Sequence, residues 1–569
     1  MKLGQREMGR WLLWGVIAAL LLLGVGLRFA DLNADPPFGL SSSAGIYFDG
    51  ISTAHSARSY VLFGEMRPDE WDGFLYSPIM TLVQIPWFKC LGTSLSEING
   101  FAATCSLLTL LCAVLLLKRL SWVAALLGAL FFSTEYLLVQ MGRVGLVENP
   151  VIVCMMLAAL AMQARKRVLF WTGMAGFLAM LAFITKAIVP YYPLAVLIGV
   201  GFRAWRDGDE QGRVMRTLLL RGGCYALGLA LATLPWLLFF RLPYAEAIEA
   251  FGGQWIRSTF PQTLGDALST STRTFIFFNM GKIQNLWLLA IPITVVVAGR
   301  FFRRPRELDP LGVLLTAWFV GGCLFISLLK ATPVRYVYTL LPALYGLLAY
   351  GLHELIKTKR FSLPKQWSTL LTDVAAVIGL TVILRYFVHY RISFGPILCG
   401  YLPKIWELLL LSFLMAAALW LAFRLVLRLL KRREIPLPLV LRVLFVLAVV
   451  GHFTKQNAVA TRNWWKTRRH TIVQTSRALG ERYPQMVIGG TAACAAVVEN
   501  RGQAIRVCKP KWCNYDNPIG RFGMTHTFIT DYAGEASRWQ GLYAEHMTNA
   551  VLRETVEVCG YPFKIFEFQ

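Results

Sequence analysis

Charged residues are scarce in this chain of 569 residues, and acidic residues are the scarcest. Asp, Glu, Lys and Arg make up 16% of the sequence, against about 25% in an ordinary soluble domain. Hydrophobic residues make up 56%, and the mean hydropathy is +0.53. A soluble or disordered chain is excluded, because only a lipid bilayer can accommodate so much apolar surface.

Sequence signatures of several enzyme classes are also missing. There is no Gly-rich phosphate loop of the Walker type, no dinucleotide fingerprint, no Gly-x-Ser-x-Gly elbow and no His-Glu-x-x-His. The seven histidines are scattered, and only His55 lies within a group of other candidate polar residues. These absences argue against ATP-driven transport by this chain alone.

Apolar runs close to the length of a membrane-spanning helix recur along the chain. They predict an α-helical integral membrane protein with about 13 transmembrane helices. The first run is long for a signal peptide and has no obvious cleavage site, so we expect it to be retained. The runs are 11–30, 101–117, 122–138, 150–163, 168–185, 187–202, 222–240, 286–298, 311–329, 340–355, 369–386, 405–423 and 439–453.

The net charge of +25 comes from basic residues in every second loop, beginning with Lys2 and ending near Arg433. By the positive-inside rule these loops are cytoplasmic, as is the N-terminus. The basic residues are spread over seven short loops rather than gathered in one patch, which argues against a nucleic-acid partner. With an odd number of spans, the C-terminus is extracytoplasmic. We expect a multi-pass protein of a bacterial-type inner (plasma) membrane.

The predicted organisation is a transmembrane domain over 1–455 and a small periplasmic α/β domain over 456–569. Two long exterior loops, 31–99 and 241–284, interrupt the first domain, and 51–63 and 80–88 within the first loop read as helices along the membrane surface. The C-terminal domain has a helical run at 467–482 and strand-like runs at 486–489, 527–530 and 555–558.

Four of the 11 cysteines lie in the C-terminal domain: Cys494, Cys508, Cys513 and Cys559. In an oxidising compartment one or two disulfides are expected, and the pairing stays open. A metal site at Cys508 and Cys513 is disfavoured, because no histidine is suitably spaced nearby.

Asp49 follows an apolar, aromatic run in the first exterior loop. Partial burial would raise its pKa and make it a better general base, unless a cation keeps it charged. The alternative is that Asp49 caps a helix beginning near Ile51.

Further charges lie beside other apolar helix ends. Arg143 and Glu148 form either a salt bridge that fixes their loop or part of an exterior active site. Lys186 and Arg335 are either snorkelling anchors or contacts to a phosphate at the membrane surface.

Taken in order, these elements resemble glycosyltransferase family 39, which includes the protein O-mannosyltransferases and the lipid A aminoarabinose transferase. The matching elements are Asp49, Ala57-Arg58, Phe63-Gly64, Arg143-Val-Gly-Leu-Val-Glu148, Thr185-Lys186, and Arg335-Tyr336 with Leu341-Pro342. The chain departs from the family in two places. Gly50 stands where Glu is usual, and Tyr76-Ser77-Pro78 stands where the lipid A branch commonly has Lys-Pro-Pro.

The resemblance implies a GT-C fold and inverting transfer of a sugar from a polyprenyl-phosphate donor to a protein, lipid A or another glycan on the outer face. It implies Asp49 as the catalytic base, or as the group that orients the acceptor, and no cofactor besides the donor. No metal-binding pair of carboxylates is evident, so no metal is assigned. The implied donor-phosphate contacts are Lys186, Arg335 and Arg58, and the implied sugar or acceptor pocket comprises His55, Arg143, Glu148, Tyr76 and Tyr336.

The rival predictions are a polytopic transporter or lipid flippase, and a non-catalytic protein that presents its C-terminal domain outside. Transporters place charges near the membrane midplane, whereas the charges here lie at helix ends. Convergence of Asp49, Lys186 and Arg335 on one outer site would favour the enzyme.

Overall fold

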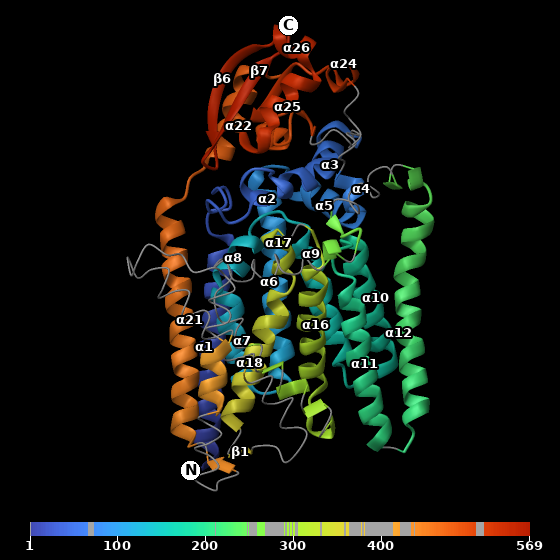
Figure 1. Ribbon diagram of the computed structural model, residues 1–569, viewed down its shortest axis with the longest axis vertical. Helices are drawn as coiled ribbons and strands as arrows, with labels where there is room; N and C mark the ends of the chain where they lie inside the picture. The colour runs from blue at the N-terminus through green and yellow to red at the C-terminus, as the bar shows by residue number, and fades with distance from the viewer. Residues whose placement is uncertain are drawn as a thin grey trace.

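The protein is a helical bundle that carries an exterior layer of short helices and a C-terminal domain at one end (Figure 1). The computed structural model describes residues 2–66, 73–210, 212–246, 305–330, 333–357, 438–507 and 517–569, with short pieces of 248–301 and 360–436. The C-terminus lies at the end with the domain, and the N-terminus lies at the opposite end. We refer to these as the domain end and the distal end.

Six helices in the described part of the chain are long and apolar enough to cross a membrane, and a bent pair, α7 and α8, makes a seventh candidate. Three further helices, α9, α11 and α18, complete the described bundle. The bounds are α1 Lys2–Phe29, α6 Leu95–Lys118, α7 Trp122–Thr134, α8 Tyr136–Gly142, α9 Glu148–Met162, α10 Val168–Thr185, α11 Tyr191–Glu210, α12 Val214–Trp236, α16 Pro310–Ser327, α18 Leu341–Lys357 and α21 Leu439–Thr467.

Several predicted spans coincide with these helices, most closely the run at 168–185, which is α10. The runs at 286–298, 369–386 and 405–423 lie largely outside the described residues, so the total of about 13 stays a prediction. The outer helices expose apolar side chains, as Leu227, Leu231 and Leu234 do along α12. A face of this kind suits lipid rather than water.

The run at 122–138 is not one straight helix but bends by 58° between α7 and α8. Glu135 lies at the break, and its carboxylate accepts a hydrogen bond from the backbone N–H of Leu138. The side-chain oxygen of Asn457, on α21, accepts another from the N–H of Tyr136 at 2.7 Å. Side chains therefore satisfy backbone donors that the bend releases, as a low-dielectric environment requires.

The exterior layer lies between the bundle and the C-terminal domain (Figure 1). Its helices are α2 Ser42–Gly45, α3 Asp49–Phe63, α4 Gly73–Tyr76 and α5 Pro78–Leu91. The two surface helices expected at 51–63 and 80–88 are present as α3 and α5. Residues 49–59 of α3 are all buried, because the bundle and the C-terminal domain cover the helix from both sides. Other short elements of the bundle are η1 Leu237–Arg241, η2 Pro305–Glu307, α17 Val334–Tyr338, β1 Arg360–Ser362 and β2 Glu434–Pro436.

The C-terminal domain has the expected α/β architecture. Its sheet has the strand order β4-β3-β5-β7-β6, in which β4, β3 and β5 are parallel and β7 and β6 are antiparallel. Two strands, β4 and β7, were not predicted. The elements are α22 Thr471–Arg482, β3 Val487–Gly489, α23 Ala493–Val497, β4 Gln503–Ile505, α24 Pro518–Phe522, β5 His526–Thr530, η3 Tyr532–Gly534, α25 Glu535–Leu542, α26 Ala544–Asn549, β6 Val551–Val558 and β7 Tyr561–Glu567.

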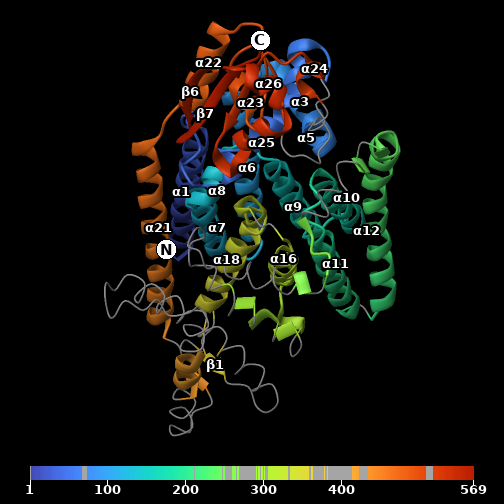
Figure 2. The same cartoon turned by 45° about the horizontal axis from the view of Figure 1, so that its top comes forward.

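The first exterior loop fixes the C-terminal domain to the bundle. The carboxylate of Asp35 accepts hydrogen bonds from the N–H of Thr471 at 2.9 Å and of Ile472 at 3.1 Å, at the start of α22. Figure 2 shows the domain beside α3, with α23 close to that helix. Of the domain's cysteines, Cys494 and Cys559 are buried free thiols, so these two are not paired with each other, and Cys508 and Cys513 lie outside the described residues.

Candidate active site

Asp49 is the first residue of α3, but its side chain does not cap the helix. The capping position is Phe48, in the left-handed conformation with φ 47°, and it makes no side-chain capping bond. The Asp49 carboxylate instead accepts hydrogen bonds from Arg335 and, at 2.9 Å, from Arg506. The interpretation of Asp49 as a cap is therefore wrong. Burial acts to raise the pKa of Asp49, but the charges of Arg335 and Arg506 outweigh it and hold the pKa below its usual value.

Two glycines bring α3 against the loop that precedes α9. A β-carbon on Gly50 would lie 3.0 Å from backbone atoms of Gly145, closer than side chains normally pack. The hydroxyl of Thr53, one turn along α3, also donates to the carbonyl of Gly145 at 3.4 Å. A larger side chain at position 50 would push the start of α3, and Asp49 with it, away from the loop that precedes α9.

Glu148 begins α9, and its carboxylate is fully buried beside two cations. The ammonium of Lys186, directly after α10, lies 2.5 Å from Glu148 Oε1, and Arg335 Nε lies 3.7 Å from the same oxygen. Glu148 therefore pairs with Lys186 and Arg335. Of the two alternatives for Arg143 and Glu148, the salt bridge between them is not formed, because Arg143 bonds instead to backbone carbonyls. Arg335, on the short helix α17, links the two carboxylates because it contacts both.

Two tyrosine rings lie beside Lys186. The ammonium lies 5.4 Å from the ring centres of both Tyr76 and Tyr336, and the guanidinium of Arg335 lies 5.5 Å from the Tyr336 ring. Such cation–π contacts orient a buried cation without neutralising its charge. Tyr76 belongs to the element that departs from Lys-Pro-Pro, so in this chain an aromatic ring lies beside the lysine.

Arg506 was not among the residues predicted for the site. It follows β4 in the C-terminal domain and is 4% exposed. Besides Asp49, its guanidinium donates to the carbonyl of Thr491 at 3.2 Å and of Tyr47 at 3.4 Å. The domain thus supplies a cation to a site that otherwise belongs to the bundle.

We call Asp49, Glu148, Lys186, Arg335 and Arg506 the charged cluster. It holds three cations and two carboxylates, and each side chain is 17% exposed or less. An excess of positive charge in a site largely removed from water favours binding of an anion, because interactions there are only weakly screened. Burial, opposed by Glu148, also lowers the pKa of Lys186. Binding an anion would stabilise its charged form.

Two residues expected at the site lie on other faces of α3. Arg58 donates to the backbone carbonyls of Val497 and Asn500 in the C-terminal domain. It comes nine residues after Asp49 and therefore points from the opposite side of the helix, given about 100° per residue. In this structure Arg58 holds the domain to α3 rather than joining the charged cluster. His55 is buried six residues after Asp49, about a third of a turn away around the helix.

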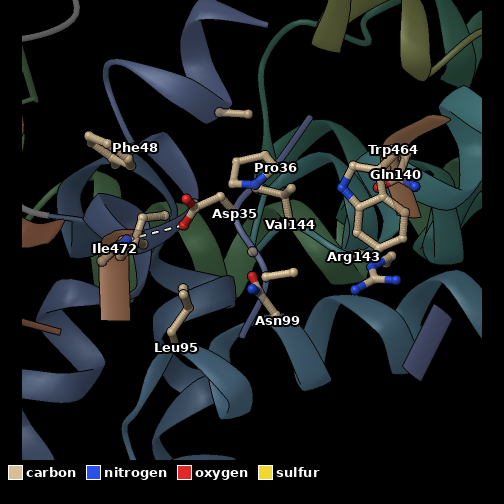
Figure 3. Close-up of a pocket in the computed structure, with 15 residues that line it drawn as sticks. Asp35, Pro36, Phe48, Leu95, Asn99, Gln140, Arg143, Val144, Trp464 and Ile472 are labelled. Atoms are coloured by element: carbon tan, nitrogen blue, oxygen red, sulfur yellow. Dashed lines mark hydrogen bonds between the residues drawn. The ribbon is translucent and has the colours of Figure 1, made fainter. Parts of the chain in front are cut away.

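Arg143 also lies outside the charged cluster. Its guanidinium donates to the carbonyls of Leu27 at 3.0 Å and Asp31 at 2.7 Å, and stacks 4.4 Å from the ring of Trp464. Figure 3 shows Arg143 beside Trp464 at the edge of a small pocket. The pocket has a volume of about 20 Å³, enough for one water molecule but not for a sugar. Arg143 therefore joins α1, α8 and α21.

Comparison with known proteins finds a likeness at the level of fold. No family model matches the sequence, and no curated protein matches it. Among solved structures, apo ArnT from Cupriavidus metallidurans aligns with a TM-score of 0.57 at 13% identity, over 99% of this chain and 98% of that one. The same protein bound to undecaprenyl phosphate aligns with a TM-score of 0.47 at 14% identity, over 97% of each chain.

The archaeal oligosaccharyltransferase AglB from Archaeoglobus fulgidus, in complex with an inhibitory peptide and a dolichol-phosphate, aligns with a TM-score of 0.46 at 10% identity. That alignment covers 92% of this chain and 70% of AglB. Of these three structures, apo ArnT, a lipid A aminoarabinose transferase, aligns with a TM-score above 0.5, and its alignment spans nearly all of both chains. At 13% identity the likeness shows the fold, and the chain has the GT-C fold.

Proposed function

We propose that this protein is a membrane glycosyltransferase that moves a sugar from a polyprenyl-phosphate donor to an acceptor at its domain end. The charged cluster carries the proposal. Its three cations and two carboxylates leave one excess positive charge, and a phosphate group would neutralise that charge. The GT-C fold supports the same reaction class.

The proposed chemistry is a single displacement at the anomeric carbon of the sugar. The acceptor oxygen forms a bond to this carbon while the bond from the carbon to the phosphate oxygen breaks. The bonding electrons leave with the polyprenyl phosphate, and the acceptor proton passes to Asp49 as general base. Attack from the face opposite the phosphate inverts the configuration. Lys186, Arg335 and Arg506 stabilise the negative charge that grows on the leaving phosphate.

Binding of the donor also prepares Asp49 for its role. Both oxygens of the carboxylate accept from arginines, which makes Asp49 a weak base in the free protein. A donor phosphate competes for Arg335 and Arg506, and each bond that it takes raises the pKa of Asp49 towards its ordinary value. The base therefore becomes stronger when the donor is in place.

The proposed setting is a bacterial-type inner membrane, with the N-terminus cytoplasmic and the C-terminal domain periplasmic. This orientation follows from the alternation of basic loops. The proposed partners are the lipid-linked sugar, the surrounding membrane lipid, and an acceptor that is a protein, lipid A or another glycan. Besides the donor, the proposed chemistry needs no cofactor.

The test is sugar transfer by the full chain in liposomes, with a panel of labelled polyprenyl-phosphate sugars and an envelope extract as acceptor. Asp49→Asn keeps the size of the side chain but removes the base, so transfer should fall by about 10²–10⁴-fold. Asp531→Asn is the matched control, because Asp531 is exposed in the C-terminal domain and pairs with Lys564 at 2.8 Å.

Full transfer by Asp49→Asn would assign the base elsewhere, with Glu148 the next candidate. Passage of intact donor across the bilayer without transfer would instead identify a lipid flippase.

A further inference from the structure

A second concentration of positive charge lies at the distal end, far from the charged cluster along α9 and α10. A hollow of about 880 Å³ opens there between α6, α9 and α10. Lys118 and Arg119, at the end of α6, and Arg165 and Lys166, between α9 and α10, line its rim. We call this hollow the basic groove.

Among the described residues, no acidic side chain pairs with the cations of the basic groove. None of its lining residues in the described part of the chain is acidic, and no salt bridge there involves these four side chains. Lys118 instead contacts the rings of Trp14 and Trp122, at 4.9 and 4.4 Å. Burial lowers the pKa of Arg119, and the positive charge of nearby Arg165 lowers it further. An anion at the rim would relieve this repulsion.

The walls of the groove are apolar and accessible from the side of the bundle. Leu115, Leu157 and Trp171 line it and are 53%, 38% and 39% exposed, respectively. The lining reaches Leu178, ten residues along α10 from Val168. At 1.5 Å per residue the apolar wall is about 15 Å deep, a depth that suits acyl chains rather than a water-soluble anion.

We propose that the basic groove binds a phospholipid whose headgroup carries two phosphates, with its acyl chains along α6, α9 and α10. Four cations drawn from two loops match two phosphates better than one. Basic pockets between membrane helices on the cytoplasmic side bind lipid headgroups of this kind. The positive-inside rule accounts for cations at this end, but not for their convergence on one hollow with apolar walls.

The test measures cardiolipin binding to the full-length protein in neutral detergent by native mass spectrometry. Arg165→Gln with Lys166→Gln removes two rim cations, and we expect about 25-fold weaker binding, from about fivefold for each cation. Arg213→Gln with Arg216→Gln is the matched control. Both are exposed at the start of α12, towards the same end of the bundle and outside the groove lining. The control should bind cardiolipin like the wild type.

Phosphatidylglycerol, with one phosphate, should bind at least about tenfold more weakly than cardiolipin. Millimolar inorganic phosphate should not displace bound cardiolipin. Equal losses in the two double variants would show that net charge alone attracts the lipid and would overturn the site. Wild-type binding by the groove variant would overturn it as well. Equal affinity for the two lipids would refute the two-phosphate headgroup, and displacement by inorganic phosphate would refute a lipid site.

Discussion

Replacing Arg506 by glutamine tests whether the C-terminal domain takes part in the reaction. The substitution removes one of three cations from the charged cluster and the 2.9 Å hydrogen bond to Asp49, while the glutamine can still donate a neutral hydrogen bond. Loss of one preorganised group that stabilises transition-state charge costs about 10²–10³-fold in rate. We therefore expect kcat for sugar transfer to fall by about 10²-fold.

The pH profile separates a role in the charged cluster from a purely structural one. Arg335 and Arg506 together hold the pKa of Asp49 below its usual value. Without Arg506 this pKa rises, so a larger fraction of Asp49 is protonated at a given acidic pH. The acid limb of the kcat/KM profile, which reports the free protein, should consequently move to higher pH. Loss of folded protein would lower the rate without this shift.

The control is Arg501→Gln, which removes the same charge from an exposed position in the same domain. Arg506→Lys keeps the charge and should recover part of the rate. Thermal unfolding of all three variants identifies any that are misfolded, because Arg506 also bonds to the carbonyls of Thr491 and Tyr47. Transfer by a folded Arg506→Gln at the rate and pH profile of Arg501→Gln would refute the reasoning.

Three other changes test separate parts of the structure. Lys186→Met keeps the length of the side chain but removes its charge, so kcat/KM for the donor should fall by about 10²-fold, and Lys186→Arg should be less impaired. Gly50→Ala places a β-carbon 3.0 Å from the Gly145 backbone, so the melting temperature and the transfer rate should both fall. The control Gly541→Ala has open space around it and should lower neither. Burial acts to raise the pKa of Asp31, but His470 and Arg468 outweigh it and lower the pKa. The stability that Asp31 contributes is present above its unfolded pKa of about 3.9 and is lost as pH falls through its folded pKa. The melting temperature of Asp31→Asn should therefore fall less steeply below pH 5 than that of the wild type. An equally steep fall in the two proteins would contradict this assignment.

Much of the bundle follows from local sequence. The apolar run at 168–185 is α10, and the alternation of strand-like and helical runs near the C-terminus gives an α/β domain. Bends are harder to predict. The run at 122–138 bends at its polar stretch, Ser133-Thr134-Glu135. Glu135 accepts one of the backbone donors released there, but the other is satisfied by distant Asn457, which no local pattern indicates.

The charged cluster was predictable only in part. Asp49, Glu148, Lys186 and Arg335 each stand out as isolated charges beside apolar helix ends, and they do converge. Arg58 was expected beside Asp49 but lies on the opposite side of α3, because residues nine positions apart on a helix point in opposite directions. Arg506 is 457 positions from Asp49, and no periodicity or motif connects them. Only the docking of the C-terminal domain on α3 brings them together.

The most direct test of the central claim follows the phosphorus of the donor. Polyprenyl-phosphate sugar is incubated with reconstituted wild-type protein and envelope acceptor, and phosphorus-31 NMR distinguishes the sugar-bearing phosphodiester from the released phosphomonoester. We expect the monoester to appear as sugar reaches the acceptor, and Asp49→Asn to form it far more slowly. Persistence of the phosphodiester in the wild type, with donor moved intact across the bilayer, would contradict the account.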